Sequence, residues 1–295
     1  MTIFKGAAVA MATPMNADGS INYECLEKMT DDQIAGGTDA LVVCGTSGEA
    51  PTLEDDEHIE AVAVVAARAK GRVPVIAGTG SNNTAHACMM SIRAREVGAD
   101  GCLLVAPYYN KATQAGLIES FTKIAEAAEI PCILYNVPSR TSTNILPETA
   151  AYLGKHVENI VAIKEASGDI SQIAKCKELA GDDLDLYSGN DDQTVPIMSL
   201  GGIGVISVLS NVAPCFTHDM TVACLDGDYD KAAKMQLQCL ELVRQLFCEV
   251  NPIPVKAALN MQGYDAGIPR LPLTEMTEEN QKNLRKAMKE LGCLK

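Results

Sequence analysis

Eight short apolar runs recur between residues 7 and 208, and they constrain the fold more than any other feature of the sequence. Each run is hydrophobic throughout rather than alternating, a pattern typical of parallel strands that are buried on both faces. The predicted strands are Ala7–Ala12, Ala40–Cys44, Val73–Ala77, Gly101–Ala106, Cys132–Tyr135, Ile160–Lys164, Leu184–Ser188 and Gly204–Val208.

The segments between these runs have the spacing of amphipathic helices. Apolar residues recur three and four positions apart in Asn22–Ala35, Leu53–Lys70, Thr84–Val97 and Thr113–Ala128. Eight strands that alternate with helices predict an α/β protein, a (β/α)8 TIM barrel. A doubly wound open sheet is the alternative, but the eight-fold count and the lack of a Gly-x-Gly-x-x-Gly turn after the first strand argue against it.

The strand pattern stops near residue 225. Tyr229–Val250, Val255–Met261 and Glu278–Leu291 have helical spacing, and the motif NPIPVK predicts a sharp break between the first two. We therefore expect a catalytic barrel over residues 1–225 and a C-terminal helical domain over residues 226–295.

Charge and hydropathy limit the classes of partner. The net charge is −14, so a nucleic-acid partner is not expected. No apolar run is long enough to suggest a membrane span. The opening MTIFKGAAVAMATPM has features of a signal peptide, but Thr13-Pro14 interrupts its short apolar stretch, which favours a first core strand and a cytoplasmic protein.

Cysteine and histidine are poorly arranged for binding metal. The chain has 11 cysteines, none in a Cys-x-x-Cys pair, and most lie inside apolar runs, as reduced and buried thiols do. Its 4 histidines are widely separated, so we predict no metal site.

Lys164 ends the sixth predicted strand in the run VAIKEAS, where a charged residue is out of place unless chemistry requires it. A desolvated lysine at a barrel mouth has a lowered pKa, and its free amine can form an imine with a carbonyl substrate. The alternative is a structural ion pair with Glu165. Neighbours on a strand point to opposite faces, so Glu165 is badly placed for that pairing.

Further polar residues follow other strands, and in such a barrel the strand ends surround the active site. Tyr135 is a candidate proton shuttle, although a tyrosine there could equally pack against its neighbours. The turn GTSGE offers the hydroxyls of Thr46 and Ser47 and backbone N–H groups that can bind a carboxylate, or it is an ordinary turn. Arg140 follows the fifth strand and could hold a carboxylate, although a solvated surface role is also open.

These motifs together resemble the dihydrodipicolinate synthase family, within the N-acetylneuraminate lyase superfamily of class I aldolases. The resemblance covers nearly the whole chain, and YNVPSRT is its most specific element, because the arginine belongs to the synthase branch. The segments that carry it are GAAVAMATPMNADGSIN, CGTSGEAPTL, VIAGTGSNNT, APYYNK, ILYNVPSRT, VAIKEASG, LYSGND, GGIGVISV and NPIPVK.

The resemblance implies condensation of pyruvate with L-aspartate 4-semialdehyde through a lysine Schiff base, in lysine and diaminopimelate biosynthesis, without an organic cofactor. It also implies a homotetramer built as a dimer of dimers. By motif position, the resemblance implies that Lys164 forms the Schiff base and that Tyr135 donates and accepts protons, with Thr46 and the partner subunit's copy of Tyr109 in a proton relay. It implies that Ser47 and the Ile206 backbone bind the pyruvate carboxylate and that Arg140 binds the carboxylate of the aldehyde. Gly189 would have a place in the substrate site.

Two departures from the family pattern stand out. Ser47 replaces the usual threonine but keeps its hydroxyl, so we expect function to be retained. In the family's lysine effector site, His86 replaces a glutamate and Asp55 replaces a histidine, which leaves feedback sensitivity open. The positions that match this site are Ala50, Pro51, Asp55, His58, Asn82, His86 and Tyr108.

Two other functions use the same residues. A sugar-acid aldolase, of the N-acetylneuraminate or 2-keto-3-deoxygluconate lyase type, would keep the imine chemistry, but Arg140 suits an aldehyde that carries a carboxylate better than a polyhydroxylated one. A non-catalytic paralogue that binds a keto acid or lysine is the third possibility. The joint presence of Lys164, Tyr135, Thr46 and Tyr109 argues against it.

Overall fold

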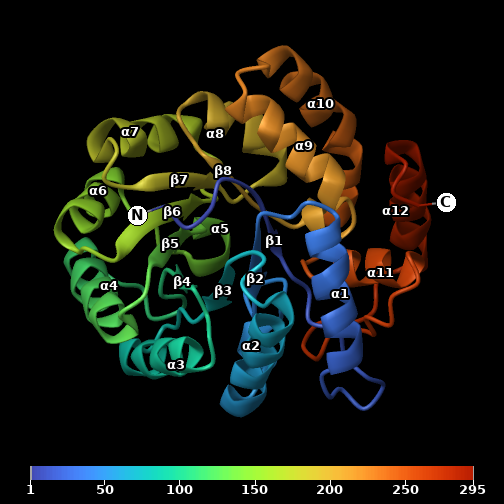
Figure 1. The fold of residues 1–295 in the computed structure, drawn as a ribbon, viewed down its shortest axis with the longest axis horizontal. Coiled ribbons are helices and arrows are strands. Elements are labelled where there is room, and N and C mark those ends of the chain that lie inside the picture. The colour runs from blue at the N-terminus through green and yellow to red at the C-terminus, as the bar shows by residue number, and fades with distance from the viewer. Residues whose placement is uncertain (1, 295) are drawn as a thin grey trace.

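The computed structural model describes residues 2–294 and shows a closed barrel of eight parallel strands, which confirms the predicted (β/α)8 fold (Figure 1). Each strand pairs with its neighbours in sequence, and β1 pairs with β8 to close the ring. The strands are β1 Gly6–Ala10, β2 Ala40–Val43, β3 Val75–Gly78, β4 Gly101–Val105, β5 Cys132–Asn136, β6 Ile160–Glu165, β7 Asp185–Ser188 and β8 Gly204–Ser207.

Helices surround the strands in the ring seen in Figure 1. None of those within residues 2–294 is long and apolar enough to cross a membrane. The helices are α1 Tyr23–Ala35, α2 Asp55–Ala69, α3 Thr84–Glu96, α4 Gln114–Ala128, α5 Pro138–Thr141, α6 Pro147–His156, α7 Ile170–Ala180, α8 Thr194–Ser199, α9 Pro214–Leu225, α10 Tyr229–Leu246, α11 Ile253–Met261 and α12 Glu278–Leu291.

The start of α11 corrects one sequence prediction. The motif NPIPVK was expected to separate two helices, with the second beginning at Val255. Instead the helix begins at Ile253, with Pro254 in its first turn. Proline is tolerated there because the first turn of a helix leaves its N–H groups without intrahelical partners.

The interior of the barrel is filled by inward-pointing side chains. Ile133, Tyr135 and Ile206 belong to one buried cluster with Tyr187. Phe4 stacks on the Tyr187 ring with centroids 4.3 Å apart, and the Tyr187 hydroxyl donates to the Phe4 carbonyl oxygen at 2.7 Å. The N-terminal segment therefore packs into the barrel beneath the inner side chains, and the opposite ends of the strands remain available for a site.

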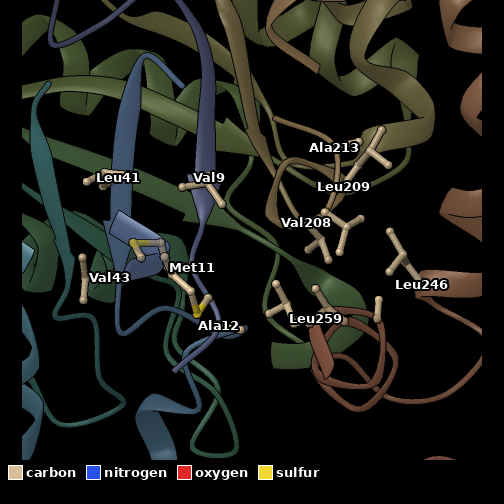
Figure 2. Packing of buried hydrophobic residues seen from close by; sticks show 14 of the residues in the cluster. Val9, Met11, Ala12, Leu41, Val43, Val208, Leu209, Ala213, Leu246 and Leu259 are labelled. Carbon is tan, nitrogen blue, oxygen red and sulfur yellow. The ribbon is translucent and has the colours of Figure 1, made fainter. Parts of the chain in front are cut away.

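The C-terminal helices share an apolar cluster with the barrel. Leu246 of α10 and Leu259 of α11 belong to the same buried cluster as Val9 of β1 and Leu41 of β2, and all four are labelled in Figure 2. Helix α12 packs on α10 and α11. The domain boundary between residues 225 and 226 stays a prediction. The shared cluster explains how the helices after that boundary are held near the barrel mouth.

Closure of the barrel depends on a glycine in β8. A Cβ at Gly204 would lie 2.1 Å from the carbonyl oxygen of Gly6, its partner in β1. We expect Gly204→Ala to lower the free energy of unfolding by about 3 kcal/mol, because the β1–β8 pairing must shift. Urea denaturation measures this. Gly116→Ala in α4 is the matched control, since its added Cβ meets only ordinary contacts, and equal stability of both variants would contradict the prediction.

Candidate active site

A cavity of about 560 Å³ opens where β2, β3, β4 and β5 end. Thr46, Tyr135 and Arg140 line it together with Tyr108, as the strand-end argument predicted. These residues come from segments far apart in the sequence. Parallel strands bring them together because all eight carboxyl ends lie on one side of the barrel.

Lys164 points into the barrel and Glu165 points out, as strand alternation predicted. The Lys164 side chain is buried, and Nζ lies 4.2 Å from the centroid of the Tyr135 ring. Glu165 accepts hydrogen bonds from Asn136 Nδ2 at 3.1 Å and from the Ser167 N–H at 2.8 Å. Burial raises the pKa of Glu165, and its hydrogen bonds oppose that shift. The carboxylate is therefore engaged away from Lys164, which argues against a structural pair between them.

Gly189 leaves room for the lysine side chain. Its N–H donates to the Glu165 carbonyl oxygen at 2.8 Å, directly after β7. A Cβ here would lie 3.1 Å from Lys164 Cε and 2.7 Å from the Ala166 Cβ. Any larger residue would press on the Lys164 side chain, so this position favours glycine on steric grounds.

The turn after β2 is closed by its own backbone. The Gly48 N–H donates to the Gly45 carbonyl at 3.1 Å, and the Glu49 N–H donates to the Thr46 carbonyl at 3.2 Å. Thr46 lines the cavity, whereas the Ser47 hydroxyl is buried. The two hydroxyl residues thus lie on one compact turn at the cavity wall.

Asn251 links two predicted ligand-binding residues and was missed in the sequence. Its Nδ2 donates to Ser47 Oγ at 3.0 Å, which leaves the serine hydroxyl hydrogen free for a ligand. The backbone carbonyl oxygen of Asn251 accepts a hydrogen bond from Arg140 Nη2 at 3.4 Å. Asn251 itself lines the cavity, beside the exposed Arg140. Asn251 begins the motif NPIPVK, which carries part of the family resemblance, but no sequence pattern indicated a binding role for the asparagine.

Tyr109 and Tyr108 differ in direction. Tyr108 lines the cavity, whereas Tyr109 is 93% exposed and has a left-handed backbone with φ of 69°. Tyr109 therefore projects away from the body of its own chain. Ile206, the remaining predicted substrate contact, lies in β8 within the inner cluster.

Most of the predicted effector positions line the same cavity. Ala50, Asp55, His58 and His86 all line it, and Asp55 Oδ1 lies 2.8 Å from His86 Nε2. Pro51 and Tyr108 complete this part of the lining. Asn82 adjoins the lining residue Ser81, and its carbonyl accepts from Asn110 Nδ2 at 2.9 Å.

His58 is buried, and its Nε2 has no hydrogen-bond partner within the described chain. Burial lowers the pKa of His58 to about 4, despite the opposing effects of a hydrogen bond with the Gly78 backbone and of the Asp55 charge. As the pH falls below about 6.5, the His58 imidazole is protonated in the unfolded chain but stays neutral in the folded one. The free energy of unfolding therefore decreases between pH 6.5 and 4. We expect about 3 kcal/mol from this group. Urea midpoints across that range should fall less for His58→Gln than for the wild type, and parallel curves would contradict the assignment.

The cysteines are free, and most are buried, as predicted. Burial raises the pKa of the Cys176 thiol to about 12, so it is not a thiolate at neutral pH. Within residues 2–294, no group of three or more His, Cys, Asp or Glu side chains is placed to hold a metal ion.

Comparison with known proteins points to one family. The sequence model of the dihydrodipicolinate synthetase family matches residues 3–291. The chain is 54% identical over 292 residues to the 4-hydroxy-tetrahydrodipicolinate synthase of Caldicellulosiruptor saccharolyticus, which covers 99% of this chain and 98% of that protein.

Solved structures agree with that match. The chloride-inhibited dihydrodipicolinate synthase of Acinetobacter baumannii, complexed with pyruvate, has a TM-score of 0.97 at 41% identity and covers 99% of this chain and 100% of its own. The enzyme of Cyanidioschyzon merolae with lysine bound has a TM-score of 0.97 at 39% identity, with 100% of both chains covered. The family model matches residues 3–291, and Lys164 lies over the Tyr135 ring inside the barrel. The chain therefore belongs to the dihydrodipicolinate synthetase family.

Proposed function

We propose that this protein condenses pyruvate with L-aspartate 4-semialdehyde to give 4-hydroxy-tetrahydrodipicolinate, in lysine and diaminopimelate biosynthesis. The observation that carries the proposal is the contact between Lys164 and Tyr135 at the barrel mouth. The relatives named as synthases of this product, and the relative whose structure holds pyruvate, support it.

The chemistry follows from the placement of these groups. The amine of Lys164 attacks the keto carbon of pyruvate, and loss of one water forms the imine. Removal of a methyl proton gives an enamine, whose carbon forms the new bond to the aldehyde carbon while the aldehyde oxygen takes up a proton. The amino group of the aldehyde substrate then adds to the imine carbon and displaces the Lys164 amine, which closes the ring and releases the product. Tyr135 gives and takes these protons because its phenol lies beside the lysine.

Two carboxylates need separate binding groups. Ser47, whose oxygen accepts from Asn251 and whose hydroxyl hydrogen is free, binds the carboxylate of pyruvate together with the backbone of Ile206 in β8. Gly189 completes the wall beside the lysine. Arg140 binds the carboxylate of the aldehyde, since its guanidinium lies at the exposed rim of the cavity.

The active form contains more than one copy of the chain. Tyr109 projects from its own subunit, and in the proposed dimer it enters the partner's site and joins Thr46 and Tyr135 in a proton relay. The exposure of a large aromatic side chain on a left-handed residue supports this role. Two such dimers form the proposed homotetramer in the cytoplasm.

We propose a second ligand site, for the effector lysine, at the positions that include Asp55 and His86. His86 stands where the family has a glutamate, and Asp55, which could supply a carboxylate in its place, already contacts His86. An ammonium group would have to compete with that contact. Inhibition measured up to millimolar lysine decides the question, and a flat curve would exclude a working effector site.

Turnover with both substrates is the direct test of the proposed reaction. A downstream reductase reports product by consumption of NADPH, and a rate that requires both pyruvate and L-aspartate 4-semialdehyde is expected. An intact oligomer without turnover would contradict the proposal. Cleavage of a sugar acid would then indicate a sugar-acid aldolase, and pyruvate binding alone would indicate a non-catalytic paralogue.

A further inference from the structure

Glu49, which directly follows the turn of Thr46 and Ser47 and also lines the cavity, forms a buried ion pair with Lys256 of α11. Lys256 Nζ lies 2.8 Å from Glu49 Oε1, and the two side chains are only 1% and 2% exposed. Glu49 Oε2 accepts the Arg270 N–H at 2.8 Å, and Lys256 Nζ also donates to the Ile268 carbonyl at 3.0 Å. Every charged atom of the pair therefore has a partner.

Stability alone does not account for this pair. The free energy needed to desolvate two charges is about as large as the free energy gained from their attraction. Apolar residues of similar volume therefore often give a folded protein of equal stability. Burial lowers the pKa of Lys256, which reflects that cost. A buried pair between distant segments does, however, define one relative position for them more strictly than apolar contacts do.

The segment that the pair holds is conformationally unusual. Glu49 has a left-handed backbone, with φ of 60° and ψ of 31°, which is unfavourable for a residue with a side chain. The backbone of Glu49 bonds to Thr46, and the Thr13 hydroxyl donates to the neighbouring Gly48 carbonyl at 2.8 Å. A displacement of Glu49 is consequently passed to the turn that bears Thr46 and Ser47.

We propose that Glu49 and Lys256 are positioning residues for the condensation, through which α11 sets the hydroxyls of Thr46 and Ser47 in the active site. The inference rests on the proposed function. Neither side chain needs to touch substrate, because both are occupied with each other and with backbone groups. The C-terminal helices are therefore part of the catalytic apparatus rather than an independent addition to the barrel.

The test is the neutral double variant Glu49→Gln/Lys256→Met, which removes both charges together. Its thermal midpoint should stay near that of the wild type, whereas either single change leaves a buried charge or acceptor unpaired and should lower it. We expect kcat/KM for pyruvate to fall about 10-fold, because the hydroxyls lose their position. The KM for the aldehyde should change less than about 2-fold, since Arg140 lies in α5, which follows a different strand from the turn of Thr46 and Ser47.

The exposed pair Lys286 and Glu290 supplies the matched control, because Glu290→Gln/Lys286→Met makes the same chemical changes on the surface of α12. It should alter neither stability nor kinetics. A stable Glu49→Gln/Lys256→Met double variant with wild-type kcat/KM for pyruvate would overturn the positioning role. An equal loss toward both substrates would also overturn it.

Glu49→Asp keeps the test decisive if the double variant does not fold. It retains the charge, but a side chain one methylene shorter cannot keep both 2.8 Å contacts, so the same selective loss toward pyruvate is expected. Wild-type kinetics of folded Glu49→Asp would overturn the proposal. An inactive wild-type enzyme would instead refute the proposed reaction, so the two failures are distinguishable.

Discussion

Lys164→Ala is expected to abolish the pyruvate adduct that borohydride traps on the wild-type protein. The side chain is buried at the mouth of the barrel with Nζ over the Tyr135 ring, and alanine removes the amine that would form the imine. Turnover should fall by about 10⁴-fold or more, as expected when a covalent nucleophile is removed. Mass spectrometry of the reduced protein detects the adduct directly.

Lys155→Ala is the control for this experiment. Lys155 is an exposed lysine in the last turn of α6, so its removal should leave adduct and turnover unchanged. A circular dichroism spectrum establishes that Lys164→Ala is folded. A full-strength adduct on the folded Lys164→Ala variant would assign the imine to another lysine.

Arg140→Ala is expected to raise the KM for L-aspartate 4-semialdehyde about 100-fold, because a charged hydrogen-bond pair contributes up to about 3 kcal/mol. The guanidinium lies at the rim of the cavity and contacts the Asn251 carbonyl at 3.4 Å. Formation of the pyruvate adduct should be preserved, since the proposed mechanism assigns that step to Lys164 and Ser47. Steady-state kinetics with each substrate varied in turn separates the two effects.

Two further variants sharpen this prediction. Arg140→Lys should recover only part of the affinity, because an ammonium cannot match the two-point geometry of a guanidinium. Arg244→Ala removes an exposed arginine on α10 and should have no kinetic effect. An unchanged KM for the aldehyde in Arg140→Ala would remove the main argument against a sugar-acid aldolase.

Much of the fold was predictable because it is encoded locally. Non-alternating apolar runs indicated strands buried on both faces, and all eight strands lie at those runs. Boundaries were less well predicted. In the sequence, Thr52 followed three residues later by Asp55 resembles a capping arrangement, but the capping box of α2 uses Glu54 and Glu57. Several polar residues adjoin at that helix start, and only the backbone geometry selects which one caps it.

The candidate site was predicted only where it follows strand ends. Lys164, Tyr135 and Thr46 each adjoin a strand, so a barrel brings them together by its topology. Asn251 could not be placed in this way. It lies 204 residues from Ser47, and their contact depends on how the segment between α10 and α11 folds over the barrel mouth.

Burial and strand alternation are properties of neighbouring residues, so the barrel, its strand ends and the inward direction of Lys164 could be predicted from local sequence. The meetings of distant groups, Glu49 with Lys256 across 207 residues and Asp55 with His86 in the cavity lining, became visible only in the folded chain. Such contacts depend on the packing of whole helices against the barrel, and local sequence patterns carry no measure of that packing.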